Sequence, residues 1–167
     1  RAHGTTGENP PVGCVIVREG RLVGLVCTAS GGSPHAETEA LAMAGKLARA
    51  ATAYVTLEPC AHHGRTPPCA EALVAAWIGR LVVACDDPDP RVAGRGYEIV
   101  RRAGIPVETG MGRNEAERDL AGFFSRIVRK RPYVILKLAI SADGKLAAMP
   151  GRQTAITGPE VKARVHM

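Results

Sequence analysis

Three side chains with the chemistry of zinc ligands stand out in this sequence of 167 residues. His35 is followed by Cys60 and, after an eight-residue spacer, by Cys69. One imidazole and two thiolates supply three ligands of a tetrahedral zinc ion and leave the fourth position for water, as in catalytic zinc sites. Glu37 lies two residues after His35 and is the candidate acid–base that takes the proton from that water.

The order H-x-E…P-C…C is the signature of zinc-dependent nucleobase deaminases. Two other interpretations stay open. If His62 or His63 were a fourth protein ligand, the zinc would be structural and the chain would be a zinc-stapled interaction module. A deaminase with another substrate, either a nucleic acid or a free cytidine or adenosine nucleotide, is the second alternative.

Strand and helix patterns alternate around these residues, which indicates the α/β class with a sheet between helices. Strands are predicted at residues 12–17, 22–26, 52–57 and 80–84, and helices at 35–50, 68–77, 96–103 and 114–129. His35 and Cys69 then lie in the first turns of two helices. Cys60 lies just past a strand end, where open α/β sheets form their ligand crevices.

Four stretches of the chain carry a more specific pattern: NPPVGCVIV (residues 9–17), HAE (35–37), TLEPCAHHGRTPPC (56–69) and DPDPRVAGRG (87–96). They resemble the pyrimidine deaminase of riboflavin biosynthesis, a family usually fused to a reductase. The resemblance implies a cytidine-deaminase-like fold, which is a three-layer α/β/α sandwich with a central mixed sheet. It also implies zinc-dependent hydrolytic deamination of 2,5-diamino-6-ribosylamino-4(3H)-pyrimidinone 5′-phosphate.

The resemblance also implies roles for individual residues. Zinc would be bound by His35, Cys60 and Cys69, protons would be carried by Glu37, and the substrate would be contacted by Asn9, Thr28, Arg65, Asp87 and Asp89. Two of these positions depart from the family pattern. Thr28 stands where a histidine is usual, and Asp89 stands where an asparagine is usual. A carboxylate at Asp89 is expected to repel a nearby phosphate.

A basic segment at residues 129–132 marks a boundary in the chain. We expect a zinc-dependent deaminase domain over residues 1–129, without the family's N-terminal helix. Residues 130–167 are expected to be a linker and the incomplete start of an α/β reductase domain, which opens with a strand at 133–140. A segment this short cannot bury a core of its own.

Two stretches of this second segment, KLAISADGK (137–145) and ITGPE (156–160), resemble the opening of the family's reductase domain. The resemblance implies NADPH as the cofactor of the completed domain. Ala139 and Ala155 occupy positions that match family cofactor contacts. Reduction of 5-amino-6-(5-phosphoribosylamino)uracil is therefore expected only of a full-length chain.

The formal charge of +6 is distributed unevenly along the chain. Residues 1–129 hold 15 basic and 14 acidic side chains, whereas residues 130–167 hold 7 and 2. The positive excess is therefore remote from the zinc motif, which argues against a nucleic-acid footprint. We expect a small phosphorylated pyrimidine as the substrate and no nucleic-acid partner. The resemblance also suggests a homo-oligomer.

The cysteine count and the hydropathy indicate the compartment. Five cysteines are an odd number in a chain too long for a disulfide scaffold, which favours a reducing, cytoplasmic location. Cys14, Cys27 and Cys85 are expected to pack in or beside strands. The sequence has no apolar run of about eighteen residues, so no membrane span or membrane partner is expected.

Overall fold

The computed structural model describes residues 4–63, 67–149, 151–152 and 154–165. The chain divides into two compact units, Arg1–Tyr133 and Val134–Met167. The predicted chemistry lies in the first unit.

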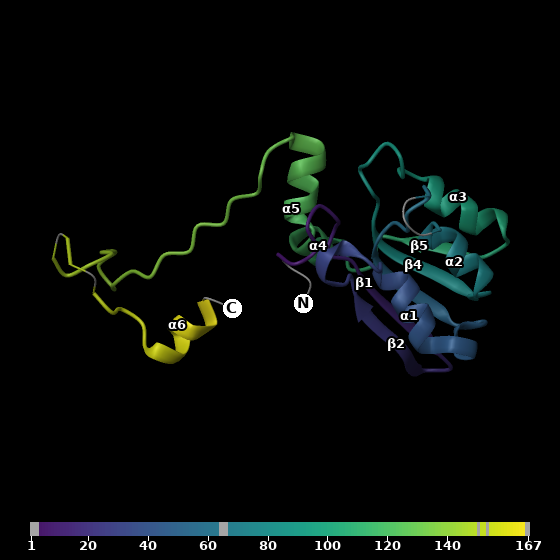
Figure 1. Cartoon of the computed structure of the whole chain (residues 1–167), viewed down its shortest axis with the longest axis horizontal. Coiled ribbons are helices and arrows are strands. Elements are labelled where there is room, and N and C mark those ends of the chain that lie inside the picture. The colour runs from purple at the N-terminus through teal and green to yellow at the C-terminus, as the bar shows by residue number, and fades with distance from the viewer. Residues whose placement is uncertain (1–3, 64–66, 150, 153, 166–167) are drawn as a thin grey trace. The chain divides into compact units, whose positions relative to one another are not determined.

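A five-stranded mixed sheet forms the centre of the first unit (Figure 1). Its strands are β1 (Gly13–Arg18), β2 (Arg21–Cys27), β3 (Thr52–Leu57), β4 (Arg80–Cys85) and β5 (Val107–Thr109), in the order β2-β1-β3-β4-β5. β1 runs antiparallel to β2 and β3, whereas β3, β4 and β5 are mutually parallel. The carboxyl ends of β3 and β4 therefore meet at one edge of the sheet, and the segments with Cys60 and Asp87 begin there.

Helices connect and cover these strands. They are α1 (Ala36–Ala44), α2 (Cys69–Ala75), α3 (Arg95–Arg102), α4 (Arg113–Asp119) and α5 (Ala121–Phe124). Short 3₁₀ turns occupy Ser30–Gly32 and Gly45–Ala48, and a π-helical segment, Ser125–Arg129, continues α5.

Helices cover both faces of the sheet. α1 packs closely on one face, because a Cβ atom added to Gly24 of β2 would lie 2.6 Å from the carbonyl oxygen of Ala40. Gly24 pairs with Ile16, while the neighbouring Val15 points to the opposite face, since side chains alternate along a strand. Val15 shares that opposite face with residues of α4. The predicted α/β/α sandwich with a mixed sheet is confirmed.

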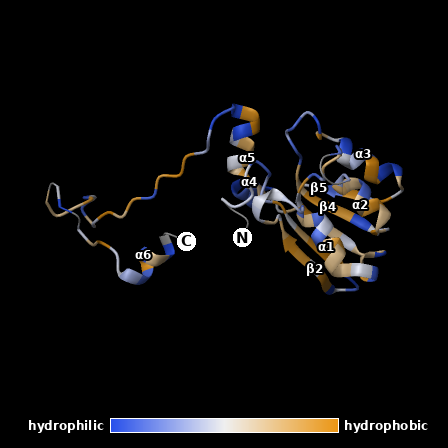
Figure 2. Cartoon of the chain, in the orientation of Figure 1, coloured by the Kyte–Doolittle hydropathy of each residue, from blue (hydrophilic) through white to orange (hydrophobic). Residues whose placement is uncertain are grey.

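The hydrophobic core fills the space between the sheet and the helices. Its largest fully buried side chains include Ile16, Leu57, Leu73, Leu81 and Leu120. The strands stand out as hydrophobic in Figure 2. Burial of such side chains contributes about 1.5–3 kcal/mol each, so this core holds the ends of β3 and β4 in place.

Two predicted helices differ from the observed ones. The helix expected over residues 35–50 ends at Ala44, because Gly45 adopts a positive φ of 52° that glycine tolerates. The helix expected over 114–129 is divided into α4, α5 and the π-helical segment. Leu120, at φ −93° and ψ 4°, leaves helical geometry between α4 and α5.

The second unit contains one helix in its described residues, α6 (Pro159–Val165). The strand predicted at residues 133–140 is wrong: the segment is extended, but no strand of the described chain pairs with it. A strand needs a hydrogen-bonded neighbour, and without one the side chains from Val134 to Leu136 stay 78–80% exposed. No helix in the described part of the chain is long and apolar enough to cross a membrane.

Candidate metal centre and substrate pocket

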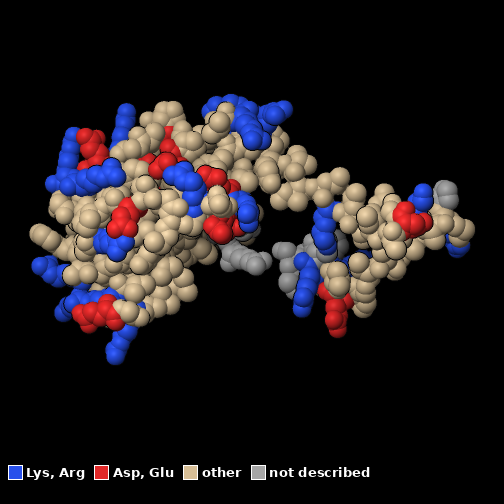
Figure 3. Space-filling model, turned by 180° about the vertical axis from the view of Figure 1, so that it is seen from behind, with Lys and Arg blue, Asp and Glu red and all other residues tan. Residues whose placement is uncertain are grey.

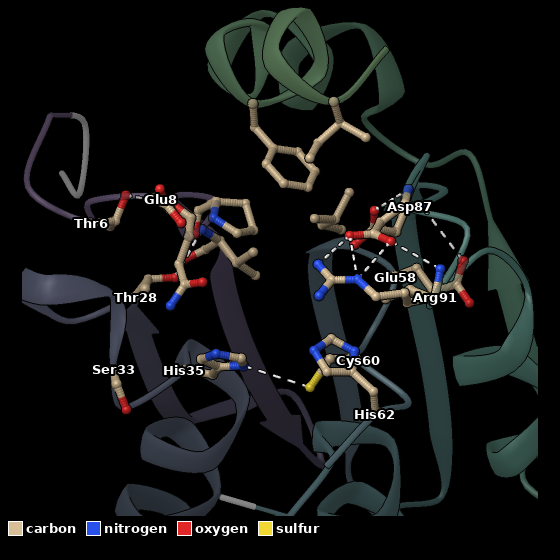
Figure 4. Close-up of a pocket in the computed structure, with 18 of the residues that line it drawn as sticks. Thr6, Glu8, Thr28, Ser33, His35, Glu58, Cys60, His62, Asp87 and Arg91 are labelled. Atoms are coloured by element: carbon tan, nitrogen blue, oxygen red, sulfur yellow. Dashed lines mark hydrogen bonds and ion pairs between the residues drawn. The ribbon is translucent and has the colours of Figure 1, made fainter. Parts of the chain in front are cut away.

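Three elements bring the predicted ligand residues together. His35 immediately precedes α1, Cys60 follows the end of β3, and Cys69 is the first residue of α2. His35 Nδ1 lies 3.3 Å from the Cys69 sulfur and 3.7 Å from the Cys60 sulfur. The ligand atoms of all three residues lie within 4.8 Å of one another. In Figure 4 the imidazole of His35 points toward the Cys60 sulfur.

Hydrogen bonds stabilise the metal-binding form of Cys60 in this cluster. The Cys60 sulfur accepts a hydrogen bond from the backbone N–H of Cys69 at 3.2 Å. The Cys69 thiol and His35 also stabilise the Cys60 thiolate, which lowers the pKa of Cys60 to about 4. The thiolate is the form that binds metals. One imidazole and two sulfurs are a donor set that suits Zn²⁺, so the residues present fit this ion.

The other two nearby histidines do not complete the cluster. Among the described histidine, cysteine and acidic residues, one group has its ligand atoms close enough to share an ion, and it consists of His35, Cys60 and Cys69. Neither His62 nor His63 belongs to that group. His63 instead lies 3.6 Å from the carboxylate of Glu71. The arrangement is that of an open, three-ligand site.

Glu37, the second residue of α1, lies beside this cluster and is only 3% exposed. Burial disfavours its ionised form and raises the pKa of its carboxyl group to about 7. A carboxyl group with a pKa near neutrality can both accept and release a proton at physiological pH.

A pocket of about 470 Å³ opens over the cluster. Such a volume suits a small-molecule ligand. The lining includes eight residues that the sequence singled out: Asn9, Thr28, His35, Glu37, Cys60, His62, Asp87 and Asp89. Arg65, the remaining predicted substrate contact, lies outside the described residues.

Asn9 and Thr28 hold the N-terminal side of this pocket together. The Asn9 side-chain amide donates a hydrogen bond to the Gly32 carbonyl at 2.8 Å. The Thr28 hydroxyl accepts from the Val12 N–H at 3.0 Å and lies 3.1 Å from the Pro10 carbonyl, to which it donates. The Thr28 hydroxyl therefore forms hydrogen bonds with the backbone just before β1.

The opposite wall is the loop after β4, in which Asp87 and Asp89 are each 8% exposed. Burial raises the pKa of Asp87 to about 6. Both oxygens of Asp89 accept hydrogen bonds from Arg91, at 2.6 to 3.1 Å, and this pairing lowers the pKa of Asp89 to about 2. The negative charge expected to repel a phosphate is thus compensated within the wall.

The structure adds lining residues that sequence reasoning missed. They are Glu8, Glu58, Arg91, Phe123 and Arg126, among others. Glu58 follows a buried strand end and directly precedes the Pro59-Cys60 pair, a position that could have marked it. The sequence offers no comparable signal for Phe123 or Arg126, which reach the pocket only because the chain turns back after β5.

The two residues matched to cofactor contacts lie in the second unit. Ala139 and Ala155 are both exposed there. Both alanines therefore lie in exposed parts of the chain, outside the helix of this unit.

The fold and the site together define a class. An α/β/α sandwich that presents a His-Cys-Cys group with a buried glutamate beside it, at the carboxyl ends of parallel strands, is the architecture of zinc-dependent nucleobase deaminases. Residues 1–85 match the family described as "Cytidine and deoxycytidylate deaminase zinc-binding region", and residues 132–167 match the "RibD C-terminal domain". The chain belongs to the cytidine and deoxycytidylate deaminase family.

Individual relatives give a finer comparison. The chain is 49% identical to the riboflavin biosynthesis protein RibD of Escherichia coli over 167 residues, which are 100% of this chain and 46% of that protein. Acinetobacter baumannii RibD is 50% identical with a TM-score of 0.83, over 96% of this chain and 45% of that one. A diaminohydroxyphosphoribosylaminopyrimidine deaminase/5-amino-6-(5-phosphoribosylamino)uracil reductase from Thermotoga maritima is 39% identical with a TM-score of 0.87, over 98% and 47%. The chain thus spans just under half the length of these relatives.

Proposed function

We propose that this chain performs the deamination step of riboflavin biosynthesis, the release of ammonia from 2,5-diamino-6-ribosylamino-4(3H)-pyrimidinone 5′-phosphate. The observation that carries the proposal is one pocket lined by Glu37, whose carboxyl group is buried, and by His35 and Cys60, which form a metal-binding cluster with the buried Cys69. Similarity to RibD proteins over the full chain supports this substrate rather than another nucleobase.

His35, Cys60 and Cys69 would hold Zn²⁺, which when bound supplies the Lewis acidity that activates water at neutral pH. Glu37 accepts a proton from the attacking water, whose oxygen bonds to the ring carbon that carries the 2-amino group. Glu37 then delivers that proton to the ring, and a further transfer to the amine lets the carbon–nitrogen bond break. Ammonia leaves and a carbonyl remains, so the atoms of water and amine balance.

The walls of the pocket would position the substrate. Asn9 and Thr28 line one side, and Asp87 and Asp89 line the other. Burial raises the pKa of Asp87 only to about 6, so its carboxyl group is still mostly ionised at neutral pH and can accept a hydrogen bond from a ribose hydroxyl. Arg65 is retained as a proposed substrate contact.

The second unit would belong to a reductase. Its match to the RibD C-terminal domain supports NADPH-dependent reduction of the deaminated product by a longer chain, with Ala139 and Ala155 near the cofactor. The described residues of this unit hold one helix and no sheet, so we expect no hydride transfer by these 167 residues alone.

The test is ammonia release from the diaminopyrimidine phosphate by the zinc-loaded chain. We expect Glu37→Gln to retain zinc, measured by elemental analysis, and to lose roughly 10²–10⁴-fold in kcat, because the amide cannot carry a proton. Glu39→Gln is the matched control, since Glu39 is an exposed acid on the same helix. Its activity should equal that of the wild type.

Other outcomes would favour the alternatives. If the wild type released no ammonia and zinc removal simply unfolded it, the cluster would be a structural zinc module. Deamination of oligonucleotides but not of the free pyrimidine phosphate would indicate a nucleic-acid deaminase. Two observations weigh against the latter: the pocket is rich in carboxyl groups, and basic and acidic side chains are interspersed on the face of the first unit that Figure 3 shows.

A further inference from the structure

The pocket has a roof that no sequence motif marks. The helical segment formed by α5 and Ser125–Arg129 contributes Phe123, Arg126 and Ile127 to the lining. In Figure 4 this green helical segment lies across the pocket from His35 and Cys60. A ligand that reaches from the cluster to the roof therefore meets these side chains at its far end.

Arg126 is held in place from two sides. Its guanidinium group lies 5.8 Å from the centroid of the Phe123 ring, a cation–π contact. One terminal N–H donates a hydrogen bond to the Glu8 carbonyl, on the loop that leads to Asn9. This bond uses one of the five N–H donors of a guanidinium group, so the others are available to a ligand.

The charge of Arg126 is not paired with a carboxylate among the described residues. The described residues that line the pocket include five acidic side chains: Glu8, Glu37, Glu58, Asp87 and Asp89. They include two arginines, and Arg91 is already paired with both oxygens of Asp89. Arg126 has no carboxylate partner in the part of the chain that the structure describes.

The backbone at this point is also unusual. Ser125–Arg129 is π-helical, a conformation that is rare in proteins and frequent at functional sites. Ser125 is buried and its hydroxyl donates to the Arg131 carbonyl at 2.9 Å, which fixes the end of the segment. The π-helical turn therefore gives Arg126 and Ile127 a defined orientation at the roof.

We propose that Arg126 binds the phosphate group of the substrate and so selects a phosphorylated pyrimidine over its dephosphorylated form. The inference rests on the proposed function, because it places the reacting ring at the cluster and the ribose phosphate toward the roof. A guanidinium group binds two phosphate oxygens in parallel, which a single point charge cannot do. Arg126 thus adds a second cation to Arg65, the contact that the family resemblance implies.

Steady-state kinetics on phosphorylated and dephosphorylated substrate test this role. Arg126→Gln should raise KM for the phosphorylated substrate roughly 10- to 100-fold, the loss expected for a charged hydrogen bond. KM for the dephosphorylated substrate should stay unchanged. Arg126→Lys should restore part of the affinity, because it keeps the charge without the fork. Arg129→Gln is the matched control: it is an exposed arginine outside the pocket lining on the same segment.

Calorimetric binding of ribose 5-phosphate separates this inference from the proposed function. If the wild type deaminates the substrate but Arg126→Gln behaves like Arg129→Gln, the phosphate role is wrong and the deaminase role stands. If the wild type releases no ammonia yet binds ribose 5-phosphate in an Arg126-dependent manner, the phosphate site stands alone. Equal losses with both substrates would show that Arg126 is only a structural link to Glu8.

Discussion

Burial and pairing give the carboxyl groups of this pocket different proton affinities. Glu37 and Asp87 are buried, so the pKa values of both lie above the ordinary range, at about 7 and about 6. Asp89 is close to Asp87, but its pairing with Arg91 lowers its pKa to about 2. Environments that separate the pKa values of neighbouring acids are a feature of catalytic sites.

The raised pKa of Asp87 has a consequence for stability. Its ordinary value of 3.8 rises to about 6 in the folded state, so the folded chain binds more protons between these pH values. Stability from this group is therefore present below pH 3.8 and is lost as the pH rises through about 6. We expect Asp87→Asn to raise the free energy of unfolding by about 1–2 kcal/mol at neutral pH, and by less under acid conditions.

Urea unfolding of the variant and the wild type at neutral and acidic pH measures this difference. Asp89→Asn is the control of opposite sign, because it removes an ion pair and should destabilise the chain by up to about 1 kcal/mol at neutral pH. An Asp87→Asn variant no more stable than the wild type at neutral pH would show that its carboxylate is not disfavoured by burial.

The sequence predicted those site residues that are marked by their spacing along the chain. The order of His35, Glu37, Cys60 and Cys69 predicts a zinc cluster, and the fold brings the three ligand candidates within 4.8 Å. Arg126 was not predictable, because its approach to the pocket depends on a helical segment that follows β5 and packs back over the sheet edge. Motifs encode local geometry, whereas this contact depends on tertiary packing.

At the scale of elements, Glu58 connects the two strand ends that build the pocket. Its carboxylate accepts backbone hydrogen bonds from Gly94 and Gly96 at 3.0 Å and from Asp87 at 3.4 Å. The approach is close, because a Cβ atom added to Gly96 would lie 2.1 Å from the Pro59 carbonyl oxygen. Glu58 therefore ties the loop after β4 to the segment that carries Cys60.

We expect Glu58→Ala to destabilise the fold by roughly 1–3 kcal/mol, because buried backbone donors lose their acceptor. Glu58→Gln keeps one carbonyl oxygen and should lose less. Hydrogen exchange at the amides of Gly94 and Gly96 should accelerate in both variants, and KM should rise because Asp87 lies in the released loop. Glu98→Ala, at an exposed site on α3, is the matched control. If Glu58→Ala exchanged at these amides like the control, the tie would be refuted.

The sequence predicted the order of the strands and helices, but it predicted the residues at which they end less well. The alternation of strands and helices gave the mixed sandwich, since hydrophobic patterning decides which face is buried. The division of the helix expected at 114–129 was not readable, because a single continuous helix satisfies the same composition. The strand expected at 133–140 failed for a different reason: β-branched residues favour a strand, but pairing requires a neighbour.

For the whole molecule, the excess positive charge and the pocket lie in different parts of the sequence. Residues 1–129 are nearly balanced, with 15 basic and 14 acidic side chains. The excess lies mainly in residues 130–167. All described residues that line the pocket lie between Thr6 and Ile127, within the unit Arg1–Tyr133. The site should therefore depend little on the second unit.

Removal of residues 134–167 tests this independence. We expect the shortened chain to keep its thermal midpoint and to release ammonia at a rate within about twofold of the full chain, since it retains every described residue that lines the pocket. A chain that ends at Tyr133 retains the hydrogen bond from Ser125 to the Arg131 carbonyl. It also loses the exposed apolar run that includes Val134, Ile135 and Leu136, so light scattering should show less association. Loss of ammonia release in a folded, zinc-loaded short chain would mean that the second unit contributes to the site, because nothing else in the pocket has changed.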